Sequence, residues 1–151
     1  MSEFEFRDVP RQYTAVVHVT TPVAAIGAAM GEALPKAFAA LGKAGAAPAG
    51  PAICKYTEYS EESVTFETGV PVAAPFPGDG DVVAGEIGGC EAAVTMHIGP
   101  YEAIVETYAK LQAWMEGQGR EPSVVMWEAY LDDPQTTDPS QLRTEVFWPA
   151  E

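Results

Sequence analysis

The chain has 151 residues, 47% of them hydrophobic, and its 22 acidic and 8 basic residues give a net charge of -14. This length allows one domain, residues 1–151, with a sizeable core and is too short for two ordinary domains. The negative charge repels phosphate backbones, so direct nucleic-acid binding is not expected, whereas cationic ligands or basic partner surfaces are favoured.

The amino-terminal residues show no secretory signal. Residues 1–8 alternate acidic and aromatic side chains without an apolar segment, and no later apolar run is expected to reach membrane-spanning length. The two cysteines, Cys54 and Cys90, share no metal-ligand spacing with His18 or His97. We therefore expect a cytoplasmic protein with no membrane contact, metal site, disulfide or cofactor.

The first half of the chain predicts four strands and two short helices. Runs rich in β-branched and aromatic residues predict strands at residues 3–6, 13–19, 52–59 and 64–70. Proline is favoured in the first turn of a helix, so one helix is expected to begin at Thr21-Pro22 and a second to cover residues 35–41. The segment 71–89 is dense in Pro, Gly and Asp and predicts a loop that links the two halves.

The second half predicts a strand at residues 92–98, a helix at 102–115, and strands at 124–131 and 142–148. The helix carries one apolar stripe, formed by Ile104, Tyr108, Leu111 and Met115. A turn, Gly99-Pro100-Tyr101, precedes the helix.

The order strand, helix, strand, strand occurs twice, at residues 13–72 and 90–149. The closest residue matches pair Ile53 with Val124, Tyr56 with Trp127 and Tyr59 with Tyr130. Such self-similarity predicts the duplication of one supersecondary unit. We expect an α+β fold whose two units form antiparallel sheets around a pseudo-two-fold axis, with helices on one side and a central groove on the other.

Glu128 is the one charged residue in the apolar, aromatic strand 124–131. A carboxylate loses hydration worth several kcal/mol in such surroundings unless a cation, hydrogen-bond donors, a proton or a ligand replaces it. One interpretation satisfies Glu128 internally, through Arg143, Arg120 or a tyrosine hydroxyl. The other makes Glu128 a ligand-binding or acid/base group, and it is favoured because the matched position in the first half is the uncharged Thr57.

Four groups of residues together resemble a known family. They are His97-Ile98-Gly99-Pro100-Tyr101, Tyr108-Ala109-Lys110-Leu111 with Trp114, Glu128-Ala129-Tyr130-Leu131-Asp132-Asp133-Pro134, and Arg143-Thr144-Glu145-Val146 with Pro149. The chain resembles the GyrI-like small-molecule-binding family, which includes the effector-binding domains of AraC- and MerR-type multidrug regulators. The resemblance implies tandem strand-helix-strand-strand (SHS2-like) repeats with a central pocket, in which a glutamate matching Glu128 contacts lipophilic cations. It also implies a stand-alone member, since no residues remain for a DNA-binding region.

Three functions from different classes follow. The first is a binding module that captures hydrophobic, often cationic small molecules. The second, also implied by the resemblance, is a hydrolase of cyclopropane-containing electrophiles, with Glu128 as base and Tyr101 or Tyr130 as hydrogen-bond donor. The third is a protein-interaction module that inhibits gyrase.

The predicted ligand contacts share the groove-facing side of the strands or the adjoining turn. They are Glu128, Tyr130, Met126, Tyr101, Thr57, Tyr59, Phe147 and His97. Phe147 and Trp148 lie on opposite faces of the last strand, and Phe147 is preferred as the groove-facing residue. His97 has a purely structural, hydrogen-bonded role as its alternative.

Overall fold

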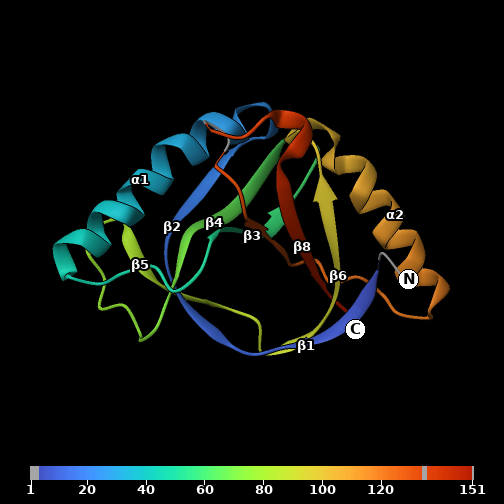
Figure 1. Ribbon diagram of the computed structural model, residues 1–151, viewed down its shortest axis with the longest axis horizontal. Coiled ribbons are helices and arrows are strands. Elements are labelled where there is room, and N and C mark those ends of the chain that lie inside the picture. Colours follow the sequence, from blue (N-terminus) through green and yellow to red (C-terminus); the bar gives the residue numbers. More distant parts are fainter. Residues whose placement is uncertain (1–3, 134–135, 151) are drawn as a thin grey trace.

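A single antiparallel sheet of eight strands carries two helices on one face (Figure 1). The computed structural model describes residues 4–133 and 136–150, so Glu3 of the predicted first strand and Pro134 lie outside the described residues. The strands are β1 Glu5–Val9, β2 Gln12–Pro22, β3 Ala52–Tyr59, β4 Ser63–Val72, β5 Val82–Ile87, β6 Cys90–Ile98, β7 Met126–Tyr130 and β8 Arg143–Pro149. The helices are α1 Ile26–Ala44 and α2 Ile104–Gly117, with short 3-10 turns η1 Val23–Ala25, η2 Tyr101–Ala103 and η3 Pro139–Gln141. The α+β class is confirmed.

The order of the strands is symmetric about the centre of the sheet, with equivalent strands of the two halves at equal distances from it. From the central pair outward, one side reads β7, β8, β6, β1 and the other reads β3, β4, β2, β5. The strand β1, which precedes β2 in the chain, therefore pairs with β6, and β5, which precedes β6, pairs with β2. We infer two copies of a strand-strand-helix-strand-strand unit that exchange their first strands.

The segment 71–89, expected to be a loop, contains the strand β5. It pairs with β2 from Ile87 against Gln12 to Val82 against Val17. The glycine that suggested a loop has a packing role, because a Cβ added at Gly85 would lie 2.8 Å from the Thr14 hydroxyl oxygen. Composition hid this strand, since a glycine at a close approach and a glycine in a loop look alike in sequence.

The ladder registers also correct the expected match between the two halves. Val16 lies between Gly69 and Val83, and Val94 lies between Phe147 and Glu5. Val16 and Val94 also precede the helix starts Ile26 and Ile104 by the same number of residues and pack in the same cluster, so Val16 is equivalent to Val94 and Gly69 to Phe147.

The same logic extends to the central strands, where Ile53 pairs with Gly69 and Trp127 pairs with Phe147. Ile53 is thus equivalent to Trp127, and Cys54 to Glu128. The predicted equivalences of Tyr56 with Trp127 and of Thr57 with Glu128 are wrong by three residues. An odd shift moves every side chain to the other face of the sheet.

The helix α1 is continuous, whereas two helices separated near Gly31 were expected. Pro35 lies inside it and cannot donate a backbone hydrogen bond to the preceding turn. Packing compensates, because Ala33, Ala37, Ala40 and Leu41 are buried against the sheet. With η1, the stretch Val23–Ala44 is long and apolar enough to cross a membrane by length and composition, which corrects the expectation that no such run exists. In this structure α1 covers the sheet, and its buried stripe of small and aliphatic residues faces the strands.

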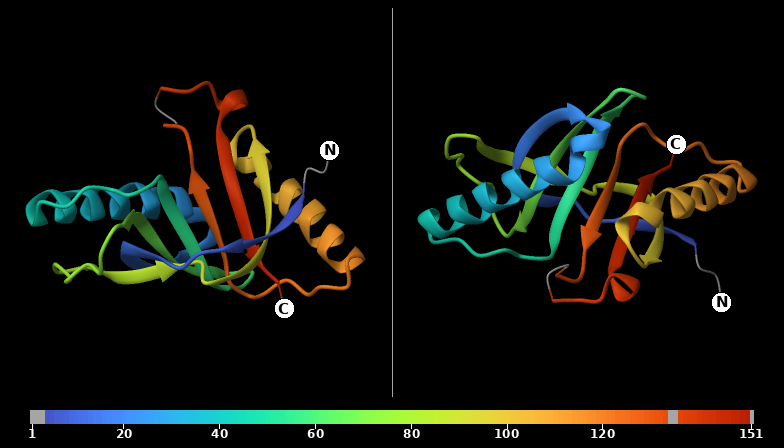
Figure 2. Two further views of the ribbon diagram at one scale, coloured as in Figure 1. Left: turned by 60° about the horizontal axis from the view of Figure 1, so that its bottom comes forward. Right: turned by 90° about the horizontal axis from the view of Figure 1, so that it is seen from above.

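The opposite face of the sheet closes on itself to form a second core. The sheet curls (Figure 2), so that residues of its two halves meet. Val16, Ile53, Val94 and Trp127 belong to this one cluster. At its centre the Trp127 and Phe147 rings stack with their centroids 4.9 Å apart and an interplanar angle of 7°.

Gly69 provides a test of the close approach between β2 and β4. A Cβ at this position would lie 1.9 Å from the Ala15 carbonyl oxygen, so Gly69→Ala should lower the free energy of unfolding by about 3 kcal/mol. Gly31→Ala is the matched control, because Gly31 is exposed in α1 and a Cβ added there would have no neighbouring atom within 4 Å. This substitution should raise the free energy of unfolding by up to about 1 kcal/mol. Urea denaturation measures both, and equal stabilities would contradict this register.

Candidate functional site

Glu128 lies at the middle of β7 and exposes 4% of its surface. Its cross-strand neighbours are Cys54 on β3 and Val146 on β8. Cys54 packs in a cluster with residues of α1, and Val146 in a cluster with residues of α2. Glu128 therefore faces the helix-covered side, where β3 and β7 run between the two helices (Figure 2, right). The expectation that it points away from the helices is wrong, because the alternation of side chains defines two faces of a strand without saying which of them the helices cover.

Two tyrosine hydroxyls hold the carboxylate. Tyr130 donates to Oε1 at 2.8 Å, and Tyr108 of α2 donates to Oε2 at 2.5 Å. The two arginines proposed as internal partners are bound elsewhere, since Arg143 pairs with Asp132 and Arg120 with Glu91. In the described part of the chain Glu128 forms no ion pair with a lysine or arginine.

Burial dominates the electrostatics of this cluster. It raises the pKa of Glu128 above its usual range, although the hydrogen bonds from Tyr108 and Tyr130 act in the opposite direction. Burial, together with the nearby charge of Glu128, also raises the pKa of both tyrosines well above the ordinary value. The phenols thus stay protonated as donors, and the carboxyl takes up a proton more readily than an exposed glutamate.

The rest of the cluster is aromatic and soft. The Tyr130 hydroxyl lies 4.0 Å from the Met30 sulfur of α1, and Cys54 is fully buried beside Tyr56. Burial raises the pKa of the Cys54 thiol, which keeps it neutral. Tyr101, 36% exposed, meets the Tyr130 ring edge-on with centroids 5.7 Å apart. It is the outermost of these rings.

The structure brings together some of the predicted site residues and separates others. Met126 and Tyr130 share the face of Glu128, and Tyr101 adjoins them. Thr57 lies at a bulge in β3, where its hydroxyl donates to the Thr65 carbonyl at 3.3 Å. Tyr59 is 64% exposed beyond the last pair of β3 with β7. Neither of these two belongs to the Glu128 cluster.

The preference for Phe147 over Trp148 is also corrected. Phe147 stacks on Trp127 in the core on the opposite face. Trp148 lies on the face of Glu128, meets the Tyr108 ring edge-on at 5.5 Å and donates from its indole nitrogen to the Ser123 carbonyl at 2.7 Å.

Four members of the cluster were not singled out from the sequence as site residues, namely Tyr108, Cys54, Tyr56 and Met30. Tyr108 was assigned to the core stripe of its helix, which does pack on the sheet. A tyrosine in a stripe of otherwise aliphatic residues was the available signal, because a buried phenol needs a hydrogen-bond partner.

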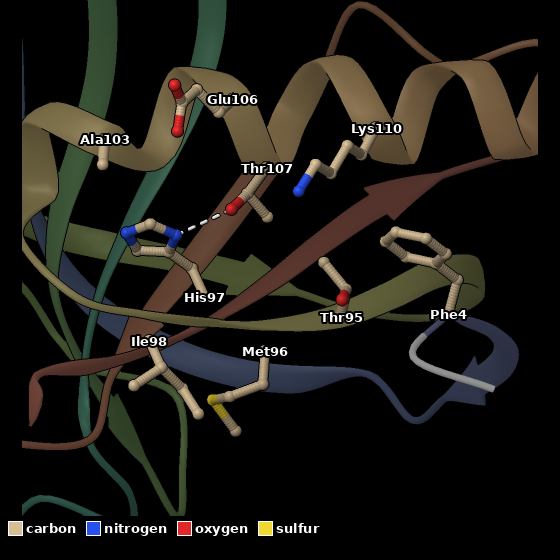
Figure 3. A pocket seen from close by; sticks show the side chains of 9 residues that line it. All are labelled: Phe4, Thr95, Met96, His97, Ile98, Ala103, Glu106, Thr107 and Lys110. Atoms are coloured by element: carbon tan, nitrogen blue, oxygen red, sulfur yellow. Dashed lines mark hydrogen bonds between the residues drawn. The ribbon is translucent and has the colours of Figure 1, made fainter. Parts of the chain in front are cut away.

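His97 is fixed by both of its ring nitrogens. Its Nε2 lies 3.0 Å from the Pro100 carbonyl oxygen and its Nδ1 lies 2.7 Å from the Thr107 hydroxyl (Figure 3). A carbonyl only accepts, so Nε2 carries the hydrogen and Nδ1 accepts from Thr107. His97 thereby ties the start of α2 to β6.

A cavity of about 450 Å³ adjoins His97 at the edge of β6. Thr95 and His97 line it from the strand, and Lys110 extends from α2 toward the strand, while Met96 and Ile98 point to the other side of β6 (Figure 3). This cavity is separate from the Glu128 cluster and shares none of that cluster's tyrosines.

The fold and the buried cluster define a small-molecule-binding α+β domain. The model of the GyrI-like small molecule binding domain matches residues 2–151, so the chain belongs to this family. No curated protein matches the chain in sequence.

The chain is similar to several solved structures, of which three are described next. The EcmrR–DNA complex has a TM-score of 0.81 and 22% identity, covering 98% of this chain and 57% of that one. The chain thus spans a little over half of that protein. The EcmrR C-terminal domain has a TM-score of 0.76 and 21% identity, with 98% and 96% covered. SAV2435 bound to tetraphenylphosphonium has a TM-score of 0.67 and 11% identity, with 99% and 94% covered.

The raised pKa of Glu128 gives a specific pH dependence. Between the ordinary carboxyl pKa of the unfolded chain and the raised folded value, the folded state binds more protons, so Glu128 lowers the free energy of unfolding as pH rises. Glu128→Gln removes this titration. Its stability relative to the parent should therefore increase as the pH rises above the ordinary carboxyl pKa of about 4, measured by urea denaturation. Glu61→Gln, at an exposed site, is the control, and equal pH trends for both variants would refute the assignment.

Proposed function

We propose that this protein captures hydrophobic cations of small size at the Glu128 cluster, as a binding protein of the cytoplasm. The main observation is a carboxylate that is 4% exposed, is held by two tyrosine hydroxyls and forms no ion pair with a lysine or arginine among the described residues. Phenol donors replace only part of the hydration that an ionised carboxylate loses on burial. A ligand cation supplies the missing electrostatic stabilisation.

The aromatic surroundings favour the same ligands. Tyr56, Tyr101, Tyr108 and Tyr130 surround the carboxylate, and an aromatic face attracts a cation by roughly 0.5–2 kcal/mol. Met30 adds a polarizable surface that adapts to ligands of different shape. The net charge of -14 draws cations toward the protein over a longer range.

A similar fold supports the proposal, since SAV2435 was solved with tetraphenylphosphonium bound. In the present structure Glu128 is closed off, so a ligand reaches it only when the side chains above it move. Tyr101 is the most exposed ring in contact with the cluster, which makes it the first to be displaced.

Charge selectivity tests the proposal. Tetraphenylphosphonium should bind more tightly than a neutral tetra-aryl analogue of the same shape, and Glu128→Gln should cost the cation about 1–3 kcal/mol, or about 5–150-fold in affinity, with little change for the neutral compound. Isothermal titration calorimetry measures both. Glu61→Gln, which alters net charge equally at an exposed site, should leave both affinities unchanged. Equal losses for both ligands would indicate collapse of the site, and no loss for either would place Glu128 outside it.

A second candidate is hydrolysis of cyclopropane-containing electrophiles. It is favoured by the carboxyl with a raised pKa in contact with two phenols, which is an acid/base arrangement. Tyr130, one of the two expected donors, donates to Glu128, and Tyr108 rather than Tyr101 is the second donor. Turnover of a cyclopropane-bearing alkylator that Glu128→Gln abolishes, while the compound still binds, would establish catalysis; binding without turnover by the parent protein would exclude it for that compound.

A further inference from the structure

Thr144 of β8 is a buried hydroxyl group without a hydrogen-bond partner. Its side chain is fully buried, and Oγ1 has no partner among the residues that the structure describes. A buried hydroxyl that makes no hydrogen bond destabilises the folded state. Such a group in a native protein calls for an explanation.

The position of Thr144 adjoins the Glu128 cluster. It is the direct cross-strand neighbour of Tyr130 on one side and of His97 on the other. Two residues further along β8, Val146 pairs with Glu128 itself. Because side chains alternate along a strand, Thr144 points to the same face as Val146 and Glu128.

The two cross-strand neighbours of Thr144, His97 and Tyr130, both form hydrogen bonds with other groups. Both ring nitrogens of His97 are engaged, with Thr107 and Pro100. The Tyr130 hydroxyl donates to Glu128 and is also hydrogen-bonded by the Tyr56 and Cys54 side chains. Among the described residues next to the carboxylate, the hydroxyl of Thr144 is therefore left without a partner, and it can accept from an N–H donor.

The fold does not require a hydroxyl at this position. In the first unit Phe66 pairs with Tyr56 as Thr144 pairs with Tyr130 in the second, so the two residues are equivalent. Phe66 is fully buried in an apolar cluster. An apolar side chain thus fills the same place in one unit, and the other unit retains an unsatisfied hydroxyl.

We propose that Thr144 forms a hydrogen-bonding subsite beside Glu128, through which the site prefers protonated amines to quaternary onium ions of similar size. The inference rests on the proposed function. The N–H of a protonated amine donates to the Thr144 hydroxyl while its charge faces Glu128. A quaternary ion has the charge and no hydrogen to donate.

The chain offers a matched control in Thr14 of β2. It is the other fully buried hydroxyl without a partner among the described residues. It alternates with Ala15 and Val17, which face the helices, so it points to the opposite face of the sheet. Thr14→Val removes an equivalent hydroxyl away from Glu128.

The binding experiment compares a tricyclic aromatic tertiary amine, protonated at pH 7, with its N-methylated quaternary salt. In Thr144→Val the affinity for the amine should fall about tenfold, and that for the quaternary salt should change less than about twofold. Thr144→Ser should restore the preference for the amine, and Thr14→Val should leave both affinities unchanged. An amine-to-quaternary affinity ratio unaltered by Thr144→Val would overturn the subsite.

Thermal unfolding of the ligand-free variants gives an independent measurement. Removal of an unsatisfied hydroxyl should leave the Tm of Thr144→Val equal to that of the parent or raise it by about 2–4 °C, with Thr14→Val behaving alike. A lower Tm for Thr144→Val would show that the hydroxyl is already satisfied in the free protein and would refute the inference. Binding of the amine that depends on Glu128 but not on Thr144 would reject this subsite and leave the proposed function standing.

Discussion

The contact of one buried carboxylate with two tyrosine hydroxyls links the centre of the sheet to its helical cover. Tyr130 lies on the strand of Glu128 itself, whereas Tyr108 belongs to α2. Only Leu111 and Met115 of that helix are buried. The hydrogen bond to Glu128 and the bond between Thr107 and His97 therefore fix the amino-terminal half of α2 over β6, β7 and β8. A hydrogen bond from α2 thus replaces part of the hydration that the carboxylate loses on burial. The same bond holds α2 in its position on the sheet.

A symmetric scaffold carries an asymmetric site. Cys54 faces Glu128 across the central ladder, and each is the equivalent of the other. Met30 and Tyr108 occupy the same place counted from the starts of their helices at Ile26 and Ile104. Phe66 is likewise the equivalent of Thr144. At these three positions one unit therefore supplies thiol, thioether and phenyl groups, and the other supplies carboxylate, phenol and hydroxyl. If the proposed function is correct, an amphiphilic cation would have one orientation in which its charged and apolar ends meet matching halves of the site.

The same arrangement explains why a stable fold keeps a costly residue. An apolar residue in place of Glu128 would fill the centre of the sheet without the loss of a carboxylate's hydration. The equivalent Cys54 does so in the other unit. The energetic cost of Glu128 stays small enough for folding because two donors reach its oxygens. The cost is not removed, and under the proposed function a cationic ligand would offset what remains of it.

The sequence alone determined the local features of this protein. Periodicity predicted β3 at its observed bounds, the apolar stripe of α2 and a single carboxylate within an apolar strand. Only the tertiary structure decided which face Glu128 occupies, because strand periodicity defines two faces without saying which one the helices cover. It also decided the partners of Glu128, since Tyr108 lies 20 residues away and Cys54 in the other unit, joined to it only through strand pairing. The strand β5 and the exchange of first strands stayed hidden for the same reason. Glycine at a close approach and pairing between distant strands are properties of the folded chain, and no local pattern encodes them.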